Sequence, residues 1–142
     1  MKAVIVAGAL CVLPAVSVYA QQAIPFAGDR EVTILTRNVY HGVDTELDAV
    51  PAAANFGELL ARVAAVYSGY FARNFPERAA AIADEAAATR PELIALQEAV
   101  LVRTQVPADG PATPATEVAL DFVQILLDAL AERGLQYEVV VQ

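Results

Sequence analysis

Several residue types that report on stability or on partners are scarce in this chain. Its 142 residues include no tryptophan, one cysteine, one histidine and one lysine. A single cysteine excludes an intrachain disulfide framework, so a packed core or a bound metal must stabilise the fold. Seventeen acidic residues against nine basic ones give a net charge of −8, which excludes a broad nucleic-acid-binding surface. The composition is 57% hydrophobic, which excludes a disordered or fibrous chain.

The first twenty residues differ from the rest. Their one charge is on Lys2, an apolar run covers residues 3–16, and Val18-Tyr19-Ala20 offers small residues before Gln21. This pattern predicts a signal peptide over residues 1–20, cleaved after Ala20. A membrane anchor is the alternative, but the apolar run barely reaches the roughly 20 residues that a span requires. We therefore expect an exported protein, periplasmic or extracellular, with no membrane span after signal removal.

Cleavage after Ala20 would leave a chain without cysteine, because Cys11 lies in the predicted signal. Residues 21–30 contain Pro25 and Gly28 and indicate a linker, and residues 31–142 suffice for one small domain. This remainder holds eight arginines, no lysine and all seventeen acidic residues, for a net charge near −9. We expect no strong nucleic-acid patch here, so any phosphate must be bound locally or through a metal.

Hydrophobic periodicity divides residues 31–142 into alternating strands and helices. We predict strands at 31–38, 93–98 and 137–141, helices at 55–70, 74–89 and from Thr116 to Gly134, and loops at 39–54 and 106–115. The apolar 93–98 strand suits burial on both faces. This order indicates an α/β fold. Because the chain ends in a strand-like run, we expect it to be the first part of a longer one.

Two polar side chains close apolar strands. Asn38 ends the first strand and Glu98 ends the second, and in α/β sheets the carboxyl ends of strands line the ligand crevice. A carboxylate beside an amide is a ligand set that Mg²⁺ accepts. The alternative is that Glu98 simply enters solvent and Asn38 caps a turn. Arg37 is a candidate for binding substrate phosphate, although it and Asn38 must point to opposite faces.

These segments resemble a known family. Thr36-Arg37-Asn38-Val39-Tyr40, the helix with Arg78, and Arg90-Pro91-Glu92-Leu93-Ile94-Ala95-Leu96-Gln97-Glu98 are similar to the amino-terminal motifs of the endonuclease/exonuclease/phosphatase superfamily, the deoxyribonuclease I-like fold. The resemblance covers residues 31–142 and is closest to the exported bacterial branch. It implies a partial two-sheet α/β sandwich, truncated at the C-terminus.

The resemblance also implies a chemistry. Glu98 would bind Mg²⁺, and Asn38 would lie in the active site, hydrogen-bonding Glu98, a substrate phosphate or, as a further ligand, the metal itself. The substrate would be a phosphoester, in nucleic acid, in a phospholipid or in a small organic phosphate. The later family motifs, Asp-x-Asn, Gly-Asp-x-Asn and the Ser-Asp-His that supplies the general base, are absent from these 142 residues. We therefore expect this portion to be inactive alone.

Other candidate residues receive structural interpretations. His41 is the only histidine, but we do not assign it as general base, because no aspartate is obviously placed to orient it. Asp44, Glu46 and Asp48 lack EF-hand spacing and indicate a solvated acidic loop. We expect the aromatic residues around Tyr67 to pack on the sheet.

Three hypotheses follow. The first is the amino-terminal portion of an exported Mg²⁺-dependent phosphoesterase. The second is a non-catalytic exported half-domain or interaction module, which the missing motifs favour. The third, which we rank last, is an unrelated stand-alone α/β binding protein.

Overall fold

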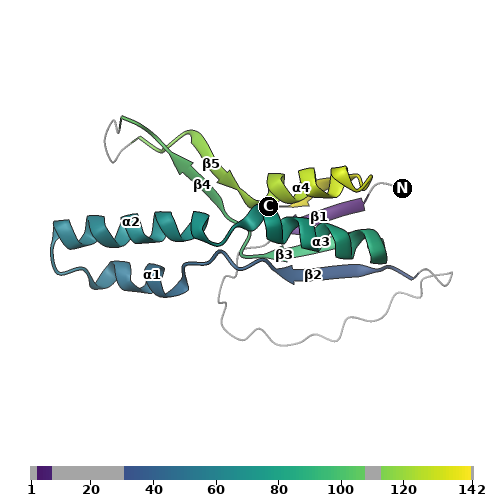
Figure 1. Cartoon of the computed structure of the whole chain (residues 1–142), viewed down its shortest axis with the longest axis horizontal. Coiled ribbons are helices and arrows are strands. Elements are labelled where there is room, and N and C mark those ends of the chain that lie inside the picture. The colour runs from purple at the N-terminus through teal and green to yellow at the C-terminus, as the bar shows by residue number, and fades with distance from the viewer. Residues whose placement is uncertain (1–2, 8–30, 108–112, 142) are drawn as a thin grey trace, which may run out of the picture.

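The computed structural model describes residues 3–7, 31–107 and 113–141 of the chain (Figure 1). The fold is mixed α/β, with 50% helix, 22% strand and two small sheets, as the sequence predicted. The elements are β1 (Ala3–Ala7), β2 (Ile34–Asn38), α1 (Asp44–Ala49), η1 (Val50–Ala52), α2 (Phe56–Ala72), α3 (Phe75–Thr89), β3 (Leu93–Gln97), β4 (Leu101–Thr104), β5 (Glu117–Asp121), α4 (Phe122–Glu132) and β6 (Tyr137–Val141).

The larger sheet is parallel, with strand order β2-β3-β1-β6. The pairing of β2 with β3 sets Ile34 beside Leu93 and Asn38 beside Gln97. The carboxyl ends of these two strands therefore meet at one edge of the sheet, as parallel strands require. The second sheet is the antiparallel β4–β5 hairpin, which extends away from the larger sheet (Figure 1).

Helices α3 and α4 pack against each other and cover one face of the larger sheet (Figure 1). The rings of Phe75 and Phe122 stack with their centroids 3.7 Å apart, and both side chains are buried. The alanines of α3 that face this core recur at helical spacing, and they are Ala79, Ala83 and Ala86. Small side chains let α4 approach closely. The alanine-rich stretch is thus a packing surface.

Only one face of β3 is deeply buried. Ile94 and Leu96 are almost wholly buried under the helices, whereas Leu93 and Ala95 on the opposite face are half-buried. The expectation that both faces of this strand are covered is therefore wrong for the described residues. The sequence pattern misled because an apolar run shows that a strand is inner, not how many layers lie over it.

Element boundaries were predicted well where caps were explicit. The α3 and β6 bounds agree with expectation, and α2 begins as its capping pattern indicates, because Asn55 accepts the Glu58 N–H and Glu58 accepts the Ala54 N–H. The predicted loop over 39–54 is wrong in part, since it contains α1 and η1.

The helix expected to start at Thr116 starts instead at Phe122. Residues 117–121 form β5, paired with the unpredicted strand β4, and the Asp121 side chain caps α4 by accepting the Gln124 N–H. The error arose because Leu120 and Val123 share a helical spacing, while the strand pairing that claims Leu120 is a contact with a distant segment.

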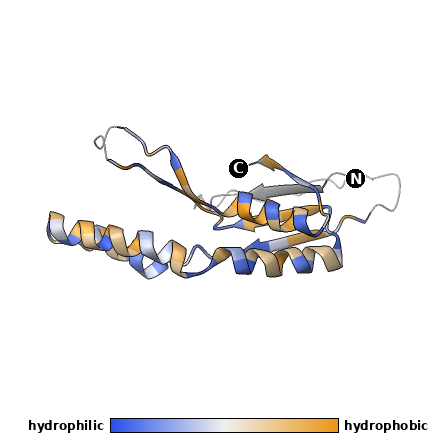
Figure 2. Ribbon diagram, turned by 45° about the horizontal axis from the view of Figure 1, so that its top comes forward, coloured by the Kyte–Doolittle hydropathy of each residue, from blue (hydrophilic) through white to orange (hydrophobic). Residues whose placement is uncertain are grey.

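Helices α1 and α2 form a hairpin that projects from the end of the sheet, so α2 packs against α1 (Figures 1 and 2). Tyr67 and Phe71 are each 42% exposed. The expectation that these aromatic residues pack on the sheet is wrong, because the chain turns at Arg73 and Asn74 before α3 reaches the sheet.

The segment Ala3–Ala7, predicted to belong to a signal peptide, forms β1 between β3 and β6. The rest of the predicted signal and the linker, residues 8–30, lie outside the described residues, and so does Cys11. No helix in the described part of the chain is long and apolar enough to cross a membrane. Removal of residues 1–20 would open the sheet between β3 and β6.

This arrangement predicts the behaviour of a truncated chain. We expect residues 21–142 to melt at a lower temperature than residues 1–142 and to aggregate more readily, because loss of β1 leaves backbone groups of β3 and β6 unpaired. Thermal unfolding followed by circular dichroism, with light scattering, tests this. A truncated chain that melts reversibly at the same temperature as the longer one would contradict it.

Candidate functional site

The two strand-end residues singled out by the sequence lie together. Asn38 ends β2, and Glu98 directly follows β3, its parallel neighbour. The Asn38 Nδ2 donates a hydrogen bond to Glu98 Oε1 at 2.5 Å. The structure thus contains the Asn38–Glu98 contact that the family resemblance implies. Glu98 does not simply enter solvent, although its side chain keeps 32% of its surface exposed.

The backbone around this contact adopts an uncommon conformation. Tyr40 and Glu98 both have positive φ angles, +46° and +59°. Such a conformation costs on the order of 1–3 kcal/mol for a residue with a side chain and persists only where surrounding contacts hold it. Two contacts do so here, because Tyr40 N donates to Asn38 Oδ1 at 2.8 Å and His41 N donates to Glu98 Oε2 at 3.3 Å.

Arg78 of α3 holds the same loop through hydrogen bonds to its backbone. Its guanidinium donates to the carbonyl oxygens of Val39 at 2.5 Å and Tyr40 at 3.0 Å, and it lies 5.2 Å from the centre of the Phe75 ring. Burial lowers the pKa of Arg78 from its ordinary value. Arg78 is a positioning residue for the loop. Its place in the amino-terminal motif was the only sequence signal for it.

Gly42 allows the end of α2 to pack closely against the loop that follows β2. Its φ is +94°, and a Cβ at this position would lie 2.4 Å from Cγ of Arg73, whose Nε donates to the Gly42 carbonyl at 3.3 Å. One residue on, Val43 is fully buried and packs against Gly69 of α2, where a Cβ would lie 2.3 Å from Val43 Cγ1. The α1–α2 hairpin is therefore fitted to the loop that carries the site.

The Glu98 carboxyl is held in its ionised form. The Asn38 amide has the largest effect and lowers the pKa of Glu98 from its ordinary value; burial opposes it, and the hydrogen bond from the His41 N–H lowers the pKa further. Each carboxylate oxygen accepts one of these two hydrogen bonds. Because a carboxylate oxygen has two lone pairs, each oxygen retains acceptor capacity for a cation or another donor.

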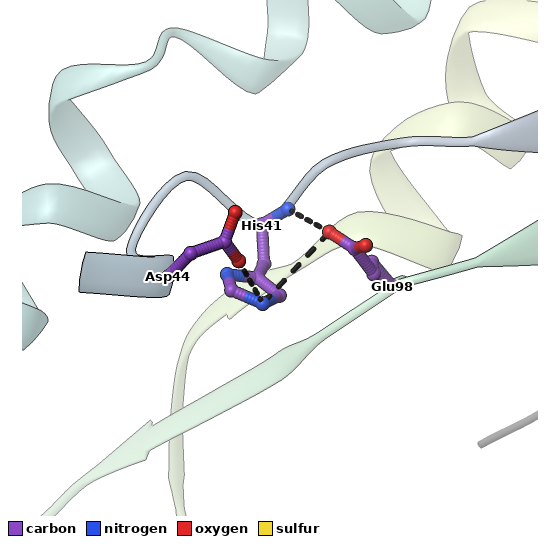
Figure 3. Close-up of side chains that lie close together, drawn as sticks. All are labelled: His41, Asp44 and Glu98. Atoms are coloured by element: carbon purple, nitrogen blue, oxygen red, sulfur yellow. Dashed lines mark hydrogen bonds and ion pairs between the residues drawn. The ribbon is translucent and has the colours of Figure 1, made fainter. Parts of the chain in front are cut away.

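His41 joins a second carboxylate to the site (Figure 3). Its Nε2 lies 3.2 Å from Asp44 Oδ1 and 3.8 Å from Glu98 Oε2, and the imidazole is 84% shielded from solvent. Asp44 stands at the start of α1, three residues after His41. The sequence pattern was interpreted as a solvated acidic loop at Asp44, Glu46 and Asp48, and for Asp44 this is wrong, because it begins α1 and lies beside His41. The i, i+3 spacing at a helix start was the available signal.

The hydrogen bonds of His41 define which nitrogen carries the proton. Val43 N donates to Nδ1 at 3.2 Å, so Nδ1 uses its lone pair as an acceptor. The proton of a neutral imidazole then sits on Nε2 and is donated to Asp44. Both nitrogens are engaged, and no lone pair is left to accept a proton from water. The expectation that no aspartate is placed to orient His41 is wrong, because Asp44 Oδ1 lies 3.2 Å from Nε2.

The same geometry decides which groups suit a metal. His41, Asp44 and Glu98 each offer a ligand atom within 4.8 Å of the other two. Metal-bound histidines usually donate a hydrogen bond from the ring nitrogen that does not bind the metal, whereas His41 Nδ1 accepts a hydrogen bond from the Val43 N–H. The two carboxylates suit a hard cation such as Mg²⁺, which binds one or two carboxylates and keeps several waters. The His41 N–H occupies the space between them.

Asn38 does not fit the role of metal ligand that the sequence analysis gave it. Its amide NH₂ faces Glu98, and its oxygen accepts the Tyr40 N–H, so no oxygen of Asn38 faces the carboxylate. This orientation follows from the partners, since a carboxylate needs a donor and a backbone N–H needs an acceptor. Asn38 is placed to orient Glu98.

Arg37 is not brought to this site. Its Nε donates to Glu85 Oε2 of α3 at 3.0 Å, and the ion pair lies on the helix-covered face of β2. The pair raises the pKa of Arg37 and lowers that of Glu85. Strand alternation, which the sequence analysis noted, separates Arg37 from Asn38. Arg37 therefore ties β2 to α3 on the face of the strand opposite Asn38.

Comparisons of the chain with family models, with curated protein sequences and with solved structures found no match.

The Asn38–Glu98 hydrogen bond predicts a measurable titration. We expect Asn38→Ala to raise the pKa of Glu98 toward its ordinary value, because the donor that most favours the carboxylate is lost. A carboxyl group whose pKa is lower in the folded than in the unfolded protein stabilises the fold at pH values above its unfolded pKa of about 4.3. This stabilisation is lost as the pH falls through the folded pKa. The difference in free energy of unfolding between the wild type and Asn38→Ala should therefore become smaller as the pH is lowered.

Carboxyl ¹³C NMR titration of Glu98 measures this pKa directly. Asn55→Ala is the matched control, because Asn55 is also exposed but caps α2 and does not contact Glu98. An unchanged Glu98 titration in Asn38→Ala would remove the assigned role of the amide.

Proposed function

We propose that this chain is the amino-terminal portion of an exported Mg²⁺-dependent phosphoesterase with a deoxyribonuclease I-like sandwich fold, in the endonuclease/exonuclease/phosphatase superfamily. The observation that carries the proposal is the Asn38–Glu98 contact at the carboxyl ends of two adjacent parallel strands. An ionised, partly exposed carboxylate with acceptor capacity left on both oxygens is what a phosphoester-cleaving Mg²⁺ site requires.

Glu98 would hold the metal, and Asp44 would add a second carboxylate once the His41 N–H left the space between the two. The bound metal would polarise phosphoryl oxygens and stabilise the leaving oxygen. Asn38 keeps Glu98 ionised and oriented. Arg78 and the His41 N–H keep the loop in register with β3. The general base would come from the later motifs, which these 142 residues lack.

The net charge of the chain bears on which phosphoesters it would bind. The chain carries a net charge of −8, which disfavours tight binding of duplex nucleic acid by this portion. Arg78, which contacts the loop of the site, already has protein partners, and Arg37 lies on the opposite face of β2. Phosphate recognition would therefore depend on the metal, whether the phosphate belongs to nucleic acid, a phospholipid or a small organic ester.

Cleavage of a signal peptide would change the larger sheet. Cleavage after Ala20 would remove β1, which lies between β3 and β6. In a longer exported protein, a later strand would have to fill this position, because inner edges of a parallel sheet do not remain open in stable domains.

A metal titration tests the proposed site on the chain itself. We expect Mg²⁺ to shift the amide NMR signal of His41 saturably, because its N–H donates to Glu98. Glu98→Gln should abolish the saturable shift, since an uncharged amide binds Mg²⁺ far more weakly than a carboxylate. Asp44→Asn should weaken binding.

Glu92→Gln is the matched control for this titration. Glu92 directly precedes the first residue of β3, at the end of the strand away from Glu98, and its carboxylate accepts the Thr33 N–H at 2.7 Å. Its variant should bind Mg²⁺ as the wild type does. A His41 signal that ignores Mg²⁺, or that responds equally in Glu98→Gln, would contradict the proposed site.

Catalysis is tested in the chain extended along the reading frame that follows Gln142. We expect the extended protein to hydrolyse bis(p-nitrophenyl) phosphate with Mg²⁺ and Glu98→Gln to reduce the rate by on the order of 100-fold or more, with an unchanged circular dichroism spectrum. Undiminished hydrolysis by Glu98→Gln would refute the catalytic assignment.

A non-catalytic interaction module is the second candidate function. It is supported by the missing motifs and by the exposed apolar side chains of α2, which a catalytic role for Glu98 does not explain. An extended frame without the later motifs, together with absent Mg²⁺ binding, would favour it.

A further inference from the structure

The ring of His41 occupies the position that a cation bridging Asp44 and Glu98 would take (Figure 3). Its Nε2 lies 3.2 Å from Asp44 Oδ1 and 3.8 Å from Glu98 Oε2. A magnesium ion binds carboxylate oxygens at about 2.1 Å, so an ion that bridged these two oxygens would lie against the Nε2 proton. The ring in this position and a bridging metal therefore exclude each other.

His41 does not suit the role of a third metal ligand in this orientation. Because Nδ1 accepts the Val43 N–H at 3.2 Å, the proton of the neutral ring is on Nε2, the nitrogen beside the two carboxylates. A metal on Nε2 would require the proton on Nδ1, where it would face the Val43 N–H. The ring is thus a hydrogen-bond donor to the carboxylates and competes with a cation for them.

Neighbouring rings hold the imidazole in place. It stacks on Tyr40 with the centroids 6.1 Å apart, and it meets the Tyr70 ring of α2 edge-on at 6.2 Å. The His41 side chain keeps 16% of its surface exposed, against 32% for Glu98 and 58% for Asp44. A cation can therefore reach the carboxylates from solvent, whereas the ring is packed between the loop and α2.

The ring can leave this position without a change in the loop that carries it. The backbone N–H of His41, not its ring, donates to Glu98 Oε2. Arg78 holds the loop separately, at the carbonyl oxygens of Val39 and Tyr40. Rotation about the side-chain bonds of His41 would give up the contacts of the ring alone, so the displacement is confined to one side chain.

We propose that His41 is an occluding side chain of the metal site, whose ring N–H holds Asp44 and Glu98 until a divalent cation displaces it and binds both carboxylates. The inference rests on the proposed Mg²⁺ site and adds its regulation. Metal binding then includes the loss of the ring contacts, so His41 lowers the metal affinity of the site. A ligand in the same place would raise it.

Substitution of His41 distinguishes these two roles. We expect His41→Asn to bind Mg²⁺ about tenfold more tightly than the wild type, because the N–H that competes with the ion is lost. The asparagine oxygen can still accept the Val43 N–H, as in an Asx-turn, so the loop keeps this contact. The readout is the backbone amide NMR signal of residue 41 in a Mg²⁺ titration, since this N–H donates to Glu98.

His41→Ala separates the effect from a newly introduced ligand. Alanine offers the metal no oxygen, so this variant should also bind Mg²⁺ more tightly than the wild type. Circular dichroism checks that both variants fold. Equal or weaker Mg²⁺ affinity in folded His41→Asn or His41→Ala would overturn the inference.

A double-mutant cycle tests whether the gain comes from Asp44. In an Asp44→Asn background, His41→Asn should change the Mg²⁺ affinity by less than about twofold, because no second carboxylate is released. Asp48→Asn is the matched control background, since Asp48 is an exposed aspartate of the same helix outside the group of His41, Asp44 and Glu98. The tenfold gain should persist there. A gain of the same size in both backgrounds would contradict the assigned role.

The displacement can be followed in the wild type, because His41 is the only histidine of the chain. Its ring protons should show nuclear Overhauser contacts to the Tyr70 ring, and these should weaken as Mg²⁺ saturates the site. Contacts that persist at saturation would refute the displacement and leave the metal site standing. If neither the wild type nor the His41 variants bind Mg²⁺ saturably, the proposed site fails and the inference fails with it.

Discussion

The parallel pairing of β2 with β3 is the constraint on which the candidate site depends. Asn38 and Glu98 are sixty residues apart in sequence, and their side chains meet because Asn38 pairs with Gln97. Side chains alternate along a strand, so a slip of one residue would exchange Asn38 for Arg37 at the site. The Arg37–Glu85 ion pair on the opposite face opposes such a slip, because it ties the same strand to α3.

A second layer of contacts turns this juxtaposition into a defined environment. The loop after β2 is held by Arg78 from α3 and by the close packing of Val43 against Gly69. It directs the His41 N–H at Glu98 and carries Asp44 into range of the His41 ring. The two helices that follow β2 thus have different roles. Helix α3 contributes to the core and holds the loop, and α2 packs against the loop while several of its apolar side chains stay exposed.

The hydrogen-bond donors around Glu98 explain how a carboxylate remains ionised at this position. A buried carboxylate without partners would take up a proton. Here an amide and a backbone N–H each satisfy one oxygen, and about a third of the side-chain surface stays exposed, so the charge is stable without a metal. Charge and acceptor capacity together make Glu98 the group most suited to bind a cation in this part of the molecule.

The sequence by itself determined the α/β class, the bounds of α3 and β6, the start of α2 and the two strand-end residues of the site, because local caps, prolines and periodicity encode them. It also separated Arg37 from Asn38, since alternation is a local property of strands. Only the tertiary structure decided the position of β5, the single covered face of β3, the approach of Asp44 to His41 and the exposure of α2. Each of these depends on contacts between segments far apart in the chain or on which surfaces a neighbour covers, and neither is contained in a local pattern.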